Sequence, residues 1–155
     1  MTLRKDEVIR VSLNADKATS GTTGVAASDL SVDLSPGVWH VRMNLGYTLT
    51  SSSSLYGAFS LGGTAGVSSG NILYSVDKKN SSTQDTFRAL SNNPTSSGTR
   101  LTSASGFPLN HLVVEGIIVV STAGSVVPYI ATDGTTVTLT LKSSVSLAEY
   151  RNVNL

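Results

Sequence analysis

Apolar and polar residues alternate strictly from Trp39 onward in the stretch 38–50, VWHVRMNLGYTLT. In a β-strand, successive side chains point to opposite faces, so this alternation predicts a strand with its odd positions in the core. The polar positions His40, Arg42 and Asn44 form the opposite face, which we expect to be solvated or to contact another subunit. The odd positions are all apolar: Trp39, Val41, Met43, Leu45, Tyr47 and Leu49.

Similar short runs rich in Val, Thr and Tyr recur between Ser- and Gly-rich stretches. They predict an all-β fold of about ten short strands, and a two-sheet antiparallel jelly-roll sandwich fits this number best. Turn residues predict two hairpins, one through Ser35-Pro36-Gly37 and one through Asp133-Gly134. The expected strands span residues 8–13, 29–34, 38–49, 55–61, 71–77, 85–90, 111–120, 126–130, 136–142 and 146–153.

Length and charge narrow the class of protein. The 155 residues contain no cysteine and are enough to bury a core without disulfides or metal. A formal net charge of +1, with no Lys/Arg run longer than two, argues against a nucleic-acid partner. The start MTLRKDE has no apolar segment behind it, and the longest apolar run is too short to span a bilayer. We therefore expect a soluble protein with no membrane partner and no cleavable export signal, made in the cytoplasm, with an arm over 1–7 and one domain over 8–155.

The segment 112–120, LVVEGIIVV, is apolar on both faces of its expected strand. One face packs in the sandwich, and the other must also be covered, because a bare apolar strip would be a large adhesive patch. We expect a subunit interface there, and the alternative is a lid from the same chain such as Phe107-Pro108-Leu109. Our candidates for the interface are Leu112, Val114, Ile118 and Val120, whereas Val113, Ile117 and Val119 lie on the other face.

Two residues inside this segment break its apolar character. Glu115 must be paired or close to water, because an isolated buried carboxylate is prohibitive, and Arg42 or Arg88 could serve as its partner. The adjacent Gly116 predicts either a β-bulge or a close approach of a neighbouring backbone.

Candidate chemistry is sparse. Residues 66–70, GVSSG, match the hydrolase motif G-x-S-x-G around Ser68, and Asp77, Asp85 and His111 follow in the hydrolase order. The motif requires a helix after the serine, and none is predicted, so a flexible loop is the preferred interpretation. The only other histidine, His40, has no ligand spacing to His111, and no pair of acids suggests a glycosidase. We predict a protein that is not an enzyme, with no metal site and no cofactor.

Five stretches together resemble a phage family: ASDLSVDLSPGVWHVRMNLGYTLT, LYGAFSLGG, NILYSVD, HLVVEGIIVVSTAGSVVP and TLTLKSSVSLAEYRNV. They are similar in pattern to jelly-roll domains of the tumour-necrosis-factor and complement-globular-head type, found in phage head-decoration proteins, head fibres and tail-fibre tips. The shared pattern is an L-S-P-G-V-W turn, a long alternating strand, a Gly-rich loop and a late V-E-G, and it covers residue 8 to the end. The resemblance implies a homotrimer about a threefold axis with a binding or structural role and no catalytic residues.

Within that family, a capsid decoration (cement) protein is the preferred interpretation. Only MTLRKDE precedes the first expected strand, whereas a fibre tip normally follows a shaft. The partner would be the major capsid protein at the outer capsid surface of the virion, with Arg4 and Lys5 of the arm as the expected contacts. The alternative is a receptor-binding fibre tip that recognises a host-surface glycan. Tyr56 is then the best residue to stack on a sugar, because Trp39 belongs to the predicted core.

Overall fold

A computed structural model describes residues 8–22, 24–51, 53–62, 66–79, 84–91, 99–104 and 110–153. This part of the chain holds twelve strands and one short 3-10 helix, which confirms the all-β prediction. The elements are β1 (Val8–Ser12), β2 (Lys17–Ser20), β3 (Val25–Ala26), η1 (Ser28–Leu30), β4 (Val32–Leu34), β5 (Gly37–Leu49), β6 (Ser53–Gly62), β7 (Gly66–Lys79), β8 (Gln84–Ser91), β9 (Thr99–Ala104), β10 (Asn110–Thr122), β11 (Gly124–Thr132) and β12 (Thr138–Asn152). For β6, β8, β9 and the end of β7, the description is of the backbone and its pairing.

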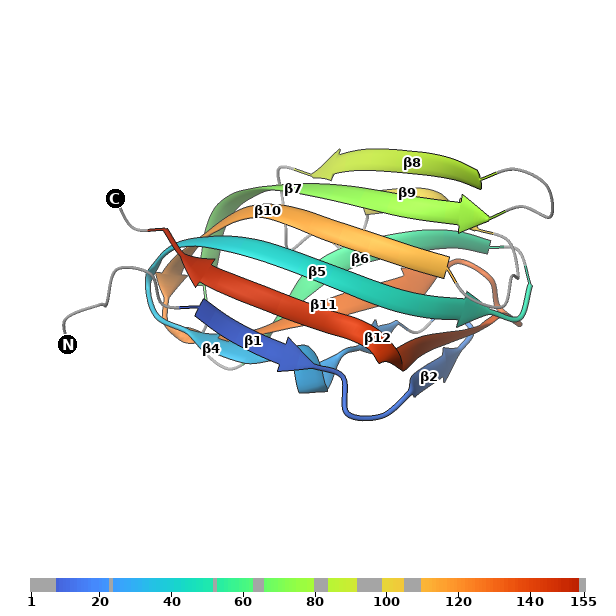
Figure 1. Ribbon diagram of the computed structural model, residues 1–155, viewed down its shortest axis with the longest axis horizontal. Helices are drawn as coiled ribbons and strands as arrows, with labels where there is room; N and C mark the ends of the chain where they lie inside the picture. The colour runs from blue at the N-terminus through green and yellow to red at the C-terminus, as the bar shows by residue number, and fades with distance from the viewer. Residues whose placement is uncertain are drawn as a thin grey trace.

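The strands form two antiparallel sheets packed as a sandwich. The seven-stranded sheet has the order β1-β12-β5-β10-β7-β8, with β2 also paired to β12. The five-stranded sheet has the order β3-β11-β6-β9, with β4 also paired to β11. Figure 1 shows the first sheet running from the blue β1 to the yellow-green β8, with β6 and β11 in the layer behind it. The expected two-sheet antiparallel arrangement is thereby confirmed.

Strand pairing is nested from the ends of the chain inward. β1 pairs with β12, β4 with β11, β5 with β10 and β6 with β9. The hairpin β7–β8 is the exception, because β7 pairs with β10 and adds two strands to the far side of the larger sheet. The chain therefore crosses repeatedly between the sheets, which is why segments remote in sequence meet.

The core follows from the alternation seen in the sequence. The six odd positions of β5 from Trp39 to Leu49 are 0–5% exposed, which confirms the predicted register. The only polar atom of the buried Trp39 side chain is hydrogen-bonded, because Nε1 donates to the Ser35 carbonyl oxygen at 3.0 Å. Side chains from β10 and β12 pack on the same inner face, so β5 lies at the centre of the larger sheet.

Both predicted hairpins are wrong. β4 pairs with β11 in the smaller sheet, whereas β5 pairs with β10 and β12 in the larger one. The turn at Ser35-Pro36-Gly37 therefore carries the chain across the sandwich, with Gly37 at φ 150°. Asp133-Gly134 likewise connects β11 of the smaller sheet to β12 of the larger one. Local turn chemistry predicts a change of direction, but it does not decide which strand becomes the neighbour.

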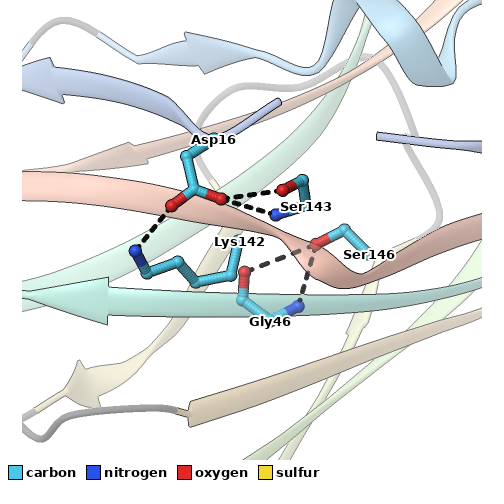
Figure 2. A network of polar contacts seen from close by, with 5 residues as sticks. All are labelled: Asp16, Gly46, Lys142, Ser143 and Ser146. Carbon is cyan, nitrogen blue, oxygen red and sulfur yellow. Dashed lines mark hydrogen bonds and ion pairs between the residues drawn. The ribbon is translucent and has the colours of Figure 1, made fainter. Parts of the chain in front are cut away.

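The segments 136–142 and 146–153, predicted as two strands, form the single strand β12 with an irregularity between Lys142 and Leu147. Figure 2 shows the contacts that hold this bulge. Asp16 accepts hydrogen bonds from Lys142 Nζ at 2.6 Å, from the Ser143 backbone N–H at 2.8 Å and from Ser143 Oγ at 3.0 Å. Ser146 Oγ accepts from the Gly46 N–H at 3.1 Å and donates to the Gly46 carbonyl at 3.4 Å, which replaces the missing ladder bonds.

The surroundings of Asp16 favour its ionised form over its protonated form. The hydrogen bond from Lys142, followed by those from the Ser143 backbone and hydroxyl, lowers the pKa of Asp16 from 3.8 to about 2. Asp16 lies between β1 and β2, so its contacts tie the edge of the sheet to the bulge of β12.

Candidate subunit interface on the larger sheet

Strand β10 directs its even positions into the core. The prediction that Leu112, Val114, Ile118 and Val120 line a subunit interface is wrong, because these side chains are only 0–3% exposed within one chain. A side chain buried inside its own protomer leaves no surface for a partner. The opposite, outward positions are Val113, Ile117 and Val119, and Ile117 is 44% exposed.

The outer face of the seven-stranded sheet, meaning the face turned away from the core, collects the exposed apolar side chains. Among the residues whose side chains the structure describes, every large apolar one that is exposed lies at an outward position of this sheet. These are Val8 on β1, Leu73 on β7, Ile117 on β10 and Leu147 on β12, which are 38–52% exposed. Single exposed apolar residues are ordinary, and four of them on one face make that face a candidate for contact with another protein.

Four charged side chains cross this outer face in one line. Arg10, Glu149, Arg42 and Glu115 are successive cross-strand partners on β1, β12, β5 and β10, so their charges alternate in sign. Arg10 Nε donates a hydrogen bond to Glu149 Oε2 at 2.7 Å. We call these four residues the charge row. Opposite charges facing each other across strands favour this register over one that would pair like charges.

Positive charge is in excess at the β1 end of the charge row. The hydrogen bond from Arg10 is the main cause that holds the pKa of Glu149 below its ordinary value, and the charges of Arg10, Arg151 and Arg42 add to it. Arg10, Arg42 and Arg151 thus surround the carboxylate of Glu149. Together these three arginines and Glu149 give the part of the outer face on β1, β12 and β5 a formal charge of +2. The negative end of the row is Glu115 on β10.

Glu115 is half-exposed at 49%, as expected for a carboxylate that must be paired or close to water. The structure pairs it with His40 rather than with the predicted Arg42. Nε2 of His40 lies 3.5 Å from Oε1 of Glu115, and the two form an ion pair when the imidazole is protonated. Arg42 is its cross-strand neighbour on β5, and the side chain of Arg88 lies outside the described part.

An open depression of about 610 Å³ lies beside this ion pair. A Cβ atom added at Gly116 would collide with the Asn71 carbonyl oxygen and lie 2.8 Å from Ile72 Cα, so the predicted close backbone approach is confirmed. The register irregularity between β10 and β7 lies further along, between Val119 and Thr122. The depression is lined by His40, Ser69, Gly70, Asn71, Gly116, Ile117 and Val119.

The structure does not assemble the hydrolase pattern. Residues 66–70, expected as a loop, belong to β7, and Ser68 Oγ donates to the Val119 carbonyl oxygen at 3.4 Å. In the pairing of β7 with β10, Ser69 lies opposite Val119 and Asp77 opposite His111. About eight residues of strand at about 3.4 Å each separate Ser68 from His111 by roughly 27 Å. Such a distance rules out a pair between Ser68 and His111.

The two histidines also lie apart. His40 is opposite Ile117 and His111 is opposite Gly46, so about six residues of strand, roughly 20 Å, separate them. Among the residues that the structure describes, no group of three or more His, Cys, Asp or Glu side chains could hold a metal ion.

Several predicted positions fall outside the described residues. Arg4 and Lys5 lie in the segment 1–7, and Phe107-Pro108-Leu109 lies in 105–109. Tyr56 is placed in β6 by its backbone, but its side chain is not described.

Arg10, Glu149 and Leu147 were not identified from the sequence as candidates for an interface. Each sits at an outward position of an alternating strand, and that alternation was a usable signal. What the sequence lacks is the pairing of β1 with β12 and of β12 with β5, which places these three side chains on one surface.

Comparison of the chain with protein-family models, with curated proteins and with solved structures gave no match. In the part of the chain that is described, no helix is both long and apolar enough to cross a membrane.

Proposed function

We propose that the sandwich is a jelly roll. A jelly roll arises when a long antiparallel ribbon wraps so that its strands lie in two sheets, with the first and last strands paired. The nested pairing of β1 with β12, β4 with β11, β5 with β10 and β6 with β9 supports this topology. On this interpretation, β7–β8 is an inserted hairpin that widens the larger sheet.

We further propose that the protein is a structural, non-catalytic component of a phage virion. Its preferred role is that of a capsid decoration protein, which binds the outer capsid surface as a homotrimer through contacts with the major capsid protein. The observation that carries the proposal is the outer face of the larger sheet, where the exposed apolar side chains and the charge row occur together. Protein interfaces combine apolar contacts with hydrogen bonds and a polar rim, and this face offers groups of both kinds.

The location of the arm is consistent with this role. Val8, the first residue of β1, is the cross-strand partner of Arg151 near the end of β12. Residues 1–7, with Arg4 and Lys5, therefore join the sandwich at the end of the larger sheet where its last strand finishes. The proposed capsid contacts Arg4 and Lys5 precede Val8, so deletion of residues 1–7 removes both without shortening β1.

Binding to empty shells tests the proposal. The probe is a shell assembled from the major capsid protein of the same genome, mixed with the purified protein and sedimented together. We expect saturable co-sedimentation that weakens when residues 1–7 are removed, with the circular dichroism spectrum unchanged. The matched control is the full chain with Thr136→Glu, which should bind like the parent. Thr136 is exposed in the turn before β12, at the end of that strand remote from Arg151. Absence of binding to shells would contradict the decoration role.

A receptor-binding fibre tip is the second candidate. The open depression beside His40 and Asn71 favours it, because a shallow site with polar side chains can accept a sugar. Binding of the purified protein to host cells or to host-surface glycans, with none to shells, would establish this role. Loss of that binding in Asn71→Ala would assign it to the depression.

A further inference from the structure

The two ends of the charge row are opposite in sign and far apart in one chain. Arg10 begins the row on β1 and Glu115 ends it on β10, with β12 and β5 between them. Three strand spacings of about 4.8 Å separate the two backbones by roughly 14 Å. Arg10 and Glu115 of the same chain therefore lie too far apart for an ion pair between them. The side chain of Arg10 is 78% exposed and that of Glu115 is 49% exposed, so both can reach a partner.

The neighbouring residues repeat this complementarity with apolar groups. Val8 lies two residues before Arg10 on β1, and Ile117 lies two residues after Glu115 on β10. A second line of cross-strand partners runs parallel to the charge row and is displaced from it by two residues along each strand. It consists of Val8, Arg151, His40 and Ile117. The β1 end of the outer face thus presents a cation beside an apolar side chain, and the β10 end presents an anion beside another.

We propose that a second copy of this chain docks head to tail on the outer face. Arg10 of each copy pairs with Glu115 of the next, and Val8 packs against Ile117 of the next. When the rotation axis is parallel to the strands, each residue keeps the same position along that axis in every copy. Arg10 of one copy then lies level with Glu115 of the next, and Val8 lies level with Ile117 of the next. Repetition of this contact closes a ring. The inference rests on the proposed homo-oligomer and assigns the contacts that hold it together.

Electrostatics favours this arrangement over its alternatives. Turning the second copy end over end would place Arg10 against Arg10 and Glu115 against Glu115, which like charges oppose. The excess positive charge around Glu149 adds to the attraction between the β1 end and Glu115. Glu115 already lies 3.5 Å from His40, so the incoming arginine would complete a three-member cluster rather than meet an isolated charge.

Charge reversal tests the pairing. Arg10→Glu and Glu115→Arg each create a like-charge contact, and each should weaken self-association by at least about tenfold. The double variant Arg10→Glu/Glu115→Arg restores opposite charges and should recover most of the parent association. Sedimentation velocity across a dilution series measures the association, and circular dichroism confirms folding.

Two further sets of variants make this test specific. The carboxylate introduced by Arg10→Glu would stand beside Glu149, so the charge-neutral variants Arg10→Gln and Glu115→Gln provide a milder second pair. Each of these should weaken association less than the corresponding reversal. Thr136→Glu is the matched control and should not alter association, because it adds a charge at an exposed position remote from the charge row.

A mixture of the two charge-reversal single variants reports the ring size. In a two-membered ring, each Arg10→Glu chain can pair with a Glu115→Arg chain at both contacts, so the mixture should associate. In a trimer, three chains of two kinds always leave one contact between like chains, so the mixture should remain weaker than the double variant. We expect the trimer result.

Two outcomes would overturn the inference in distinguishable ways. If all four single variants associated as strongly as the parent, the pairing of Arg10 with Glu115 would be wrong and the proposed function would stand. A parent that is monomeric at high concentration would overturn both the pairing and the trimer.

Discussion

Ile117 and Ile118 are adjacent in β10 and point to opposite faces of the sheet, with Ile117 44% exposed and Ile118 fully buried. This assigns the two apolar faces of the segment 112–120. The face of Ile118 packs in the sandwich, and the face of Ile117 is available to a partner. The two residues are of the same type and lie in the same strand, so substituting each in turn separates the stability of the protomer from the proposed self-association.

Substitution by aspartate should affect folding at one of these positions and self-association at the other. In Ile118→Asp the charge is buried without a partner, so we expect the protomer to unfold or to lose about 4 kcal/mol or more. In Ile117→Asp the charge lies on the surface, so we expect a folded chain with weakened self-association. Circular dichroism and sedimentation on the parent and both variants measure the two effects. An Ile117→Asp chain that is unfolded, or an Ile118→Asp chain that melts like the parent, would show that the faces have been exchanged.

The same comparison can be made on β5. Met43 is 1% exposed, whereas Arg42 is exposed on the outer face. We expect Met43→Asp to cost several kcal/mol of unfolding free energy, on the order of 3–5 kcal/mol, because it removes apolar burial and buries a charge. Arg42→Ser should leave the protomer folded, with a change in unfolding free energy of about 0.5 kcal/mol. Equal melting temperatures for the two variants would contradict the register of β5.

The hydrogen bonds of Asp16 make the stability of the bulge pH-dependent. Because its pKa falls from 3.8 to about 2 on folding, Asp16 contributes stability above about pH 4 and loses that contribution as the pH falls towards 2. We expect Asp16→Asn to lower the melting temperature at pH 7, with a difference from the parent that narrows between about pH 4 and pH 2. Thermal melts at several pH values measure this difference.

Lys142→Met supplies the control for that experiment, since Lys142 is the largest cause of the lowered pKa of Asp16. The pH dependence should shrink in this variant even though Asp16 is present. If Asp16→Asn shifted the melting temperature equally at both ends of the pH range, the carboxylate would not be the source of the effect.

The sequence predicted the local structure of β5 well because one side of it is apolar and the other polar. The pattern of β10 gives no such guidance. Val113, Ile117 and Val119 are as apolar as the residues that face the core, so alternation establishes two faces without saying which is inside. That choice depends on the neighbours: Val113 and Ile117 lie beside Asn44 and His40, two polar side chains at outward positions of β5. Cross-strand pairing is a long-range property that a local pattern does not encode.

The crossovers between the sheets were missed for the same reason. Proline and glycine at 35–37 predict a turn, and the chain does turn there. Whether the strands on either side pair or separate depends on where their apolar faces are buried. Leu34 and Trp39 both belong to the core, and each reaches it from a different sheet. The strands β2, β3 and β9 were not predicted. β2 and β3 have only four and two residues, which is too few for a periodic signal.

Two buried tyrosines give a matched test of the core. Tyr150 and Tyr47 are both fully buried, and burial raises the pKa of each hydroxyl well above its ordinary value. Tyr150 OH donates a hydrogen bond to the Leu30 carbonyl oxygen at 3.1 Å, which joins β12 to η1. Tyr47 OH has no hydrogen-bond partner among the residues that the structure describes.

Removing each hydroxyl should therefore have unequal consequences. Tyr150→Phe breaks a buried hydrogen bond and leaves the Leu30 carbonyl without it, so we expect a loss of about 1–3 kcal/mol. Tyr47→Phe removes a polar atom that is buried without compensation, so we expect no loss and a gain of up to about 1 kcal/mol. Urea denaturation of the parent and both variants measures the difference, because the two substitutions remove the same atom and change little else. A loss in Tyr47→Phe as large as that in Tyr150→Phe would mean that the Tyr47 hydroxyl is hydrogen-bonded in solution, for example to a buried water molecule.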